Sequence, residues 1–341
     1  MAGTDEQLHA RRQRPRAPIA RTTGPERGAE PPPAAEAPVV ATPPFVLSAG
    51  EPLSEGITRV AGEQLDAAVR RLENPAGVGA KDVHEARKSL KRLRALARLL
   101  RPVLADEDYR RENEALRDAA RHLAGARDAE VIALTLDRLA RDEGDDAFAA
   151  LRTHLQGERE AAAARLQADA GPAREAAAEL GVVRGRAVAW VDATADFAAI
   201  EPGLRRLYRE GRERHRRVRR RATVERLHEW RKRVKDLRYC AQLLAPLDPE
   251  RMADLAEQAD RLGEILGDEH DVGVLVAFAK AHPELFTSPA ERTRLRKLAR
   301  RESARLRRRA IRLGDELYAR RPRRFTRPLV RATAADAPEP R

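Results

Sequence analysis

The stretch LHEWRKRVKDLRYCAQLL, Leu227–Leu244, carries a basic set and an apolar set of residues at helical spacing. Each residue of an α-helix advances by about 100° around the axis. Roughly one third of the circumference then holds the basic residues His228, Arg231, Lys232, Lys235 and Arg238. The opposite face holds Leu227, Val234, Leu237, Ala241 and Leu244. We therefore predict an amphipathic helix with one cationic face and one face in the core.

The same pattern occurs 144 residues earlier in VHEARKSLKRLRALARLL, Val83–Leu100. Its basic residues repeat the later ones position for position: His84, Arg87, Lys88, Lys91 and Arg94. A second echo follows each copy, because HLAGARDAEV (His122–Val131) parallels EILGDEHDVGV (Glu264–Val274), with Asp128 matching Asp271. A repeat of this length is too long for a solenoid unit. It predicts a duplicated helical bundle with a pseudo-twofold axis between the halves.

The rest of the chain also favours helices. Ala, Leu, Arg and Glu dominate, aromatic residues make up only 4%, and alternating runs of β-branched residues are essentially absent. We predict an all-α fold. Its helices are expected over 54–73, 81–101, 107–125, 127–142, 145–170, 203–222, 224–245, 249–267, 269–281 and 289–320, with short helical pieces over 173–198.

Composition predicts where the ordered domain begins and ends. Residues 1–50 are rich in Pro, Ala and Arg without periodicity, which is typical of a disordered tail. The ordered helical domain is expected over 51–330, with a first half of about 51–181 and a second half of about 201–330. Residues 331–341 are expected to form a short disordered C-terminal tail.

The single cysteine, Cys240, excludes a disulfide framework within the chain and reads as a small packed residue. No apolar run approaches the ~20 residues of a membrane span, and the N-terminus lacks a secretory apolar region. These features predict a cytoplasmic protein. The net charge of +13 favours an anionic partner.

The positive charge is concentrated in particular segments. Lys81–Arg101 has a net charge of +6, and Arg205–Arg238 and Ala290–Phe325 have +11 each, whereas Asp106–Gly181 and Pro246–Pro289 have −7 each. Concentrating like charges is costly without a counter-anion. We therefore predict a positive groove or pore lined by 81–101, 205–222, 224–245 and part of 289–320, with an acidic exterior. Beside the two repeated sets, it would include Arg209, Arg212, Arg216, Arg219, Arg220, Arg301, Arg305 and Arg308.

Other interpretations of these residues stay open. The arginines could form solvated faces paired with acids such as Glu225 and Glu229. A metal site could draw on His84, His228, His270, Asp128 and Asp271, although neighbouring cations disfavour a divalent metal. A phosphohistidine relay is chemically conceivable. We expect the two aspartates instead to cap a helix or to bridge to an arginine such as Arg94 or Arg238.

The paired pattern H-x-x-R-K-x-x-K-x-L-R, each copy followed some 43 residues later by an aspartate, resembles the CHAD family, the conserved histidine α-helical domain. The resemblance covers roughly Ser54–Leu329. It implies two four-helix-type bundles around a basic central cavity that binds inorganic polyphosphate, and for some members an association with storage granules. The chain looks like a stand-alone member, because the Glu-x-Glu-x-Lys signature of a triphosphate tunnel domain is missing.

The chemistry of the residues agrees with this expectation. Polyphosphate has one negative charge per phosphate and no bases, so arginine and lysine donors suffice. Single-stranded nucleic acid usually adds aromatic stacking, which few aromatic residues here could supply. We therefore predict a polyphosphate-binding protein without enzymatic activity, cofactor or metal. The alternatives are a sequence-independent nucleic-acid binder, through duplex backbones, and a granule-surface adaptor.

Overall fold

The computed structural model describes residues 42–75, 77–123, 128–141, 143 and 147–335. These residues form α-helices joined by turns and three short 3-10 helices, and no strand occurs among them. The α-helices are α1 (Leu53–Leu72), α2 (Ala80–Leu100), α3 (Asp106–His122), α4 (Asp128–Ala140), α5 (Ala149–Ala168), α6 (Gly171–Arg186), α7 (Phe197–Arg220), α8 (Val224–Leu243), α9 (Pro249–Ala281), α10 (Pro289–Leu317) and α11 (Pro322–Ala335). The prediction of an all-α fold is confirmed. None of the described helices is long and apolar enough to cross a membrane.

Three helix boundaries differ from the sequence prediction. α9 runs without a break through Gly267, where a chain break was expected. α7 begins at Phe197, upstream of Pro202, with the Asp196 carboxylate accepting a hydrogen bond from the Ala199 N–H (3.2 Å). α11 was not predicted, and it includes residues that were assigned to the C-terminal tail. In each case packing outweighs the local breaker signal.

The N-terminal boundary also differs. Residues 42–50 were predicted to belong to the disordered tail, but Phe45 and Leu47 are buried in the core. The Leu47 N–H donates to the Leu243 carbonyl (3.0 Å), and the Thr42 hydroxyl donates to the Glu85 carboxylate (2.8 Å). The ordered part of the chain therefore begins before residue 51. The rest of the predicted tail lies outside the described residues.

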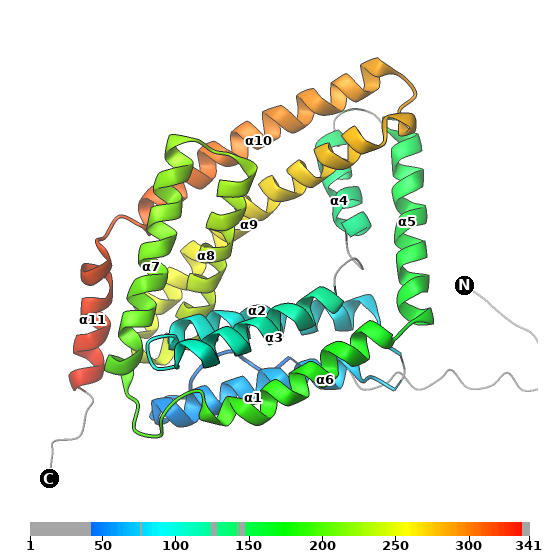
Figure 1. Ribbon diagram of the computed structural model, residues 1–341. Coiled ribbons are helices and arrows are strands. Elements are labelled where there is room, and N and C mark those ends of the chain that lie inside the picture. Colours follow the sequence, from blue (N-terminus) through cyan, green and yellow to red (C-terminus); the bar gives the residue numbers. More distant parts are fainter. Residues whose placement is uncertain (1–41, 76, 124–127, 142, 144–146, 336–341) are drawn as a thin grey trace, which may run out of the picture. The chain divides into compact units, whose positions relative to one another are not determined.

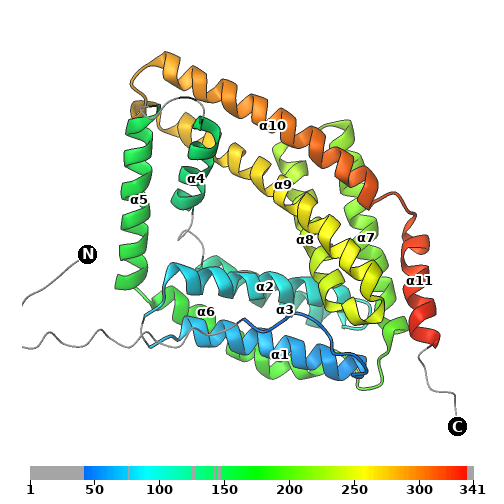
Figure 2. The same cartoon turned by 180° about the vertical axis from the view of Figure 1, so that it is seen from behind.

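Within the body formed by the described residues, the helices pack in two main groups (Figures 1 and 2). α1, α2, α3 and α6 pack together, and α7, α8, α9, α10 and α11 form the second group. α2 packs against both α7 and α8, and one hydrophobic core runs through both groups. The two copies of the repeated stretch, which lie in α2 and α8, are therefore neighbours in space.

α4 and α5 depart from the expectation of bundles built from consecutive halves. Both belong to the first half of the sequence, yet α4 packs against α9 and α10. A smaller hydrophobic cluster holds this region together, with Ile132 and Leu136 of α4, Phe148 and Leu151 beside and in α5, and Leu275 of α9. α4 thereby closes one side of the space between α2 and α9.

Candidate functional site

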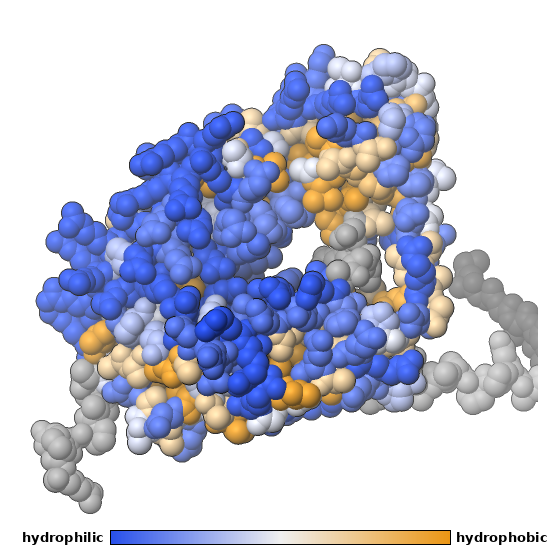
Figure 3. Space-filling view, in the orientation of Figure 1, coloured by the Kyte–Doolittle hydropathy of each residue, from blue (hydrophilic) through white to orange (hydrophobic). Residues whose placement is uncertain are grey.

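A cavity of about 520 Å³ lies between α2, α4, α8 and α9; we call it the α2–α9 cavity. Figure 3 shows hydrophilic residues bordering the hollow between α2 and α9. Its described lining holds more cationic than anionic side chains: Lys81, His84, Arg87, Lys91, Glu130, Arg231, His270 and Asp271, together with apolar residues. Three members of the first repeated set and one of the second therefore face the same space.

A second hollow of about 470 Å³ lies between α8 and α9; we call it the α8–α9 groove. Three cations of α8 line it at helical spacing, namely Arg231, Lys235 and Arg238. Four carboxylates of α9 face them across the groove: Asp260, Glu264, Asp268 and Asp271. Arg231 and Asp271 line both hollows, so the groove and the cavity adjoin.

Arg231 is held at this junction by a close approach to α9. A Cβ atom added at Gly267 would lie 2.9 Å from Nη2 of Arg231, so the guanidinium occupies space that a side chain would take. Burial lowers the pKa of Arg231, while Asp271 and Asp268 oppose that shift. Its Nε has no hydrogen-bond partner within the described part of the chain. Arg231 therefore has a buried donor that no described residue satisfies.

Lys235 has the most altered basicity among the cations of the groove. Burial, followed by the charges of Arg231, Lys91 and Arg238, lowers its pKa to about 7, and only Asp271 works in the opposite direction. An ammonium group that is costly to protonate in the free protein gains strongly from a bound anion. Lys235 is therefore suited to respond to an anionic ligand.

Arg238 and Arg94 meet different partners. Arg238 Nη1 forms an ion pair with Asp260 Oδ1 at 2.6 Å and lies over the Tyr239 ring at 5.7 Å. Arg94 Nε donates to the Asn113 amide oxygen at 3.4 Å, and burial lowers the pKa of Arg94. Asp271 was expected to cap a helix or to bridge to an arginine of the basic face such as Arg238; Arg238 instead pairs with Asp260, and Asp271 lies by Arg231 of the same face. The side chain of Asp128 lies outside the described residues.

Three histidines lie in or beside the α2–α9 cavity. His84 and His270 line the α2–α9 cavity, and the rings of His228 and His270 have centroids 5.0 Å apart. Burial lowers the pKa of both His228 and His270. Within the described residues no three His, Cys, Asp or Glu side chains are placed to hold a metal ion. The histidines thus sit beside the cationic lining without an evident metal geometry.

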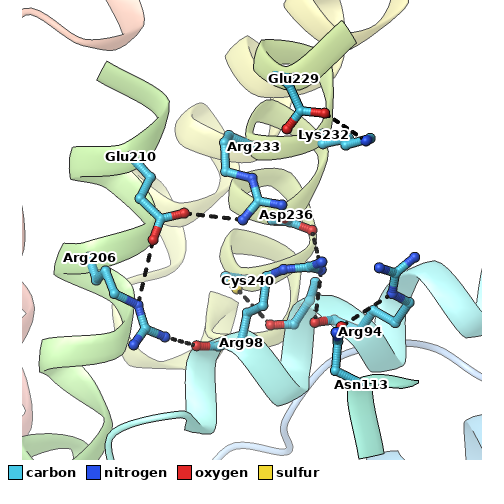
Figure 4. Close-up of polar contacts among 11 residues, drawn as sticks. Arg94, Arg98, Asn113, Arg206, Glu210, Glu229, Lys232, Arg233, Asp236 and Cys240 are labelled. Carbon is cyan, nitrogen blue, oxygen red and sulfur yellow. Dashed lines mark hydrogen bonds and ion pairs between the residues drawn. The ribbon is translucent and has the colours of Figure 1, made fainter. Parts of the chain in front are cut away.

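A buried ion network joins the two helix groups below the cavity, and sequence reasoning missed it (Figure 4). Arg98 of α2 pairs with Asp236 of α8 (3.3 Å), and Asp236 also pairs with Arg233 (3.2 Å). Arg233 reaches Glu210 of α7 (3.1 Å), while Arg206 donates to the Arg98 carbonyl (2.6 Å). Burial raises the pKa of Asp236, and the arginines oppose this. The only sequence signal was an acid inside a basic stretch.

The remaining predicted residues lie elsewhere. Lys88 and Lys232 pair with acids on their own helices, Glu85 (3.5 Å) and Glu229 (2.7 Å). None of the predicted arginines of α7 and α10 lines either hollow: Arg209, Arg212, Arg216, Arg219, Arg220, Arg301, Arg305 and Arg308.

Some of those arginines have partners of their own, which shows that they need no ligand to be placed. Arg212 donates to the Tyr318 carbonyl (3.0 Å), Arg219 pairs with Asp315 (2.8 Å), and Arg305 pairs with Glu302 (2.7 Å). The predicted lining by 205–222 and 289–320 is therefore replaced by α4 and α9. The predicted acidic exterior also needs correction, because acids of α9 face inward.

Cys240 is buried, as expected for a packed residue, and its Sγ lies 3.9 Å from the Ala95 carbonyl of α2. It therefore contributes to the contact between the two repeated helices. Burial raises the pKa of its thiol well above the ordinary value, which disfavours the reactive thiolate.

Comparison with known proteins extends these observations. A family model described as the CHAD domain matches residues 59–280. The crystal structure of the CHAD domain from the plant Ricinus communis superposes with a TM-score of 0.54 at 18% sequence identity, covering 90% of this chain and 99% of that one. No curated protein matches the sequence. At this identity, the structural likeness supports the fold.

Proposed function

Because this chain belongs to the CHAD domain family, we propose that it binds inorganic polyphosphate in the α2–α9 cavity and the adjoining α8–α9 groove. The observation that carries the proposal is the convergence of the two repeated sets: Arg87 and Lys91 of α2 and Arg231 of α8 line the same cavity. Cations brought this close repel, and a polyanion would relieve that cost. The binding would need no chemistry from the protein, so we also propose that it is not an enzyme.

The arrangement of donors suits a flexible phosphate chain. Arg87 and Lys91 approach from α2, and Arg231 approaches from α8 into the same cavity. Arginine can contact two phosphate oxygens at once, whereas lysine supplies a compact charge. In this proposal, the two helix groups are the pseudo-twofold halves and the cavity is their shared central site.

A titration against long-chain polyphosphate at several salt concentrations tests the proposal. The affinity should fall steeply with salt, since binding releases counterions. The variant Arg87→Gln/Lys91→Gln should weaken binding by at least about tenfold. A matched control is Arg300→Gln/Arg309→Gln, at exposed positions of α10 outside both hollows, which should change the affinity by less than about threefold. No binding by the wild type, or equal effects of the two variants, would refute it.

A second candidate, the binding of duplex nucleic acid, is favoured by the exposed arginines outside the hollows. Arg216 and Arg220 on α7 and Arg301 and Arg308 on α10 are exposed. These exposed cations would suit phosphates along a rigid duplex. Competition between polyphosphate and duplex DNA at equal phosphate concentration separates the two functions.

A role at storage granules, in the cytoplasm, would follow from polyphosphate binding. A fluorescent fusion imaged in cells with and without polyphosphate tests it, because localisation that persists without polyphosphate would indicate a protein adaptor.

A further inference from the structure

Carboxylates of α9 already face the cations of α8. On α8, Arg238 pairs with the Asp260 carboxylate at 2.6 Å, and Arg231 faces Asp271 and Asp268. On α2, Arg87 donates to the Leu123 carbonyl oxygen (2.6 Å), which carries no net charge. The second set is thus paired with acids of its own half.

The sequences of the two halves differ at two of these acidic positions. When Leu123 is matched with Leu266, Asp260 and Glu264 of α9 correspond to Arg117 and Arg121 of α3. At these two positions the first half has arginines where the second half has carboxylates, whereas Asp271 matches the carboxylate Asp128. Because α9 continues through Gly267, its acids follow the groove at helical spacing beside the cations of α8.

A carboxylate in such a position acts on binding as well as on stability. An incoming phosphate must displace it from the cation or accept its repulsion, and either effect lowers the affinity. A cation already paired with a carboxylate also holds fewer solution anions, so it releases fewer counterions when a ligand takes over.

We propose that Asp260 and Asp271 of α9 are an internal competitor of the polyanion, which gains full contact with the cations of α8 only by displacing them. This inference rests on the proposed polyphosphate binding. It assigns the two carboxylates a role in setting affinity.

The test compares two double variants of the full chain that remove the same charge from the same helix. Asp260→Asn/Asp271→Asn removes the facing carboxylates and keeps their shape. Asp254→Asn/Glu257→Gln removes exposed acids that line neither hollow. Circular dichroism establishes that both variants are folded, and biolayer interferometry measures their affinity for immobilised long-chain polyphosphate between low and moderate salt.

We expect Asp260→Asn/Asp271→Asn to raise the affinity for polyphosphate by roughly tenfold or more at moderate salt. Asp254→Asn/Glu257→Gln should raise it by less than about threefold, because exposed charges are screened. The plot of log affinity against log salt should steepen by about one unit for Asp260→Asn/Asp271→Asn, since freed cations release more counterions. Equal gains for the two variants, or an unchanged salt slope for Asp260→Asn/Asp271→Asn, would overturn the inference while leaving the proposed function intact.

Absence of binding in the wild type, whether or not a variant binds, would instead overturn the proposed function, and the inference with it.

Discussion

Lys91 of α2 and Lys235 of α8 occupy equivalent positions of the repeat, and the charge of Lys91 helps to lower the pKa of Lys235 to about 7. Burial is the larger cause, and Arg231 and Arg238 contribute as well. Two positive charges therefore repel each other at the contact between the two halves. This repulsion is relieved when an anion lies between the two charges.

The first prediction concerns pH. In the free protein, Lys235 loses its proton as the pH rises through about 7, whereas a bound polyanion favours the ammonium form. Affinity for polyphosphate should therefore be greatest below this pH and fall by roughly tenfold between pH 7 and about 8.5, with proton uptake on binding. Titration calorimetry in two buffers of different ionisation enthalpy measures that uptake.

Lys235→Arg is the control for this effect, because arginine keeps its charge throughout the range. The variant should lose most of the pH dependence. A wild-type affinity that is constant from pH 7 to 8.5 would count against a ligand contact by Lys235.

The second prediction concerns the buried ion network. Asp236→Ala leaves Arg98 and Arg233 without their shared carboxylate, so the free energy of unfolding should fall by about 3 kcal/mol or more. Glu229→Gln removes an exposed partner of Lys232 on the same helix and should cost less than about 1 kcal/mol. Chemical denaturation measures both. Similar values for the two variants would show that the network does not hold the helix groups together.

The sequence predicted the helices and the repeated sets because periodicity reports which face of a helix is apolar. It could not predict which neighbouring helix would close the cavity, since that depends on how α4 crosses to α9. The arginines of α7 and α10 share the composition of the α8 set, yet they lie outside the hollows because their helices present those positions to other partners.

Long-range pairing explains what sequence reasoning missed. The acid Asp236 looked like a break in a basic stripe, and its meaning appears only when Arg98, 138 residues away, lies beside it. Likewise, the glycine at 267 indicated a break between helices, whereas the structure uses its missing side chain to seat Arg231. A glycine signals either a turn or a close approach, and local sequence does not distinguish them.

The third prediction concerns a close contact between helices. A Cβ atom at Gly203 of α7 would lie 1.9 Å from the Leu99 carbonyl oxygen of α2, so the helices would have to separate. Gly203→Ala should lower the free energy of unfolding by roughly 2–4 kcal/mol. At Gly185 on α6, no packing neighbour in the described part of the chain comes within 4 Å of an added Cβ, so Gly185→Ala should be neutral or stabilising by up to about 1 kcal/mol. Equal melting temperatures for the two variants would contradict this packing.

The last prediction separates stability from binding at Gly267. An alanine there would place its Cβ 2.9 Å from Arg231 Nη2, the end of a flexible side chain that can move aside. Since alanine also favours the helix, Gly267→Ala should keep or raise the free energy of unfolding by up to about 1 kcal/mol. The displaced guanidinium should nevertheless weaken polyphosphate binding severalfold.

Gly273→Ala on the same helix is the matched variant, because among the described residues no packing neighbour comes within 4 Å of its added Cβ. It should gain the same helix stability and leave the affinity unchanged. Thermal unfolding and interferometry on the two proteins therefore give a paired result. If both variants bind polyphosphate as tightly as the wild type, the position of Arg231 against α9 does not affect binding. If only Gly267→Ala loses affinity while its fold is intact, the position of the Arg231 guanidinium is important for binding.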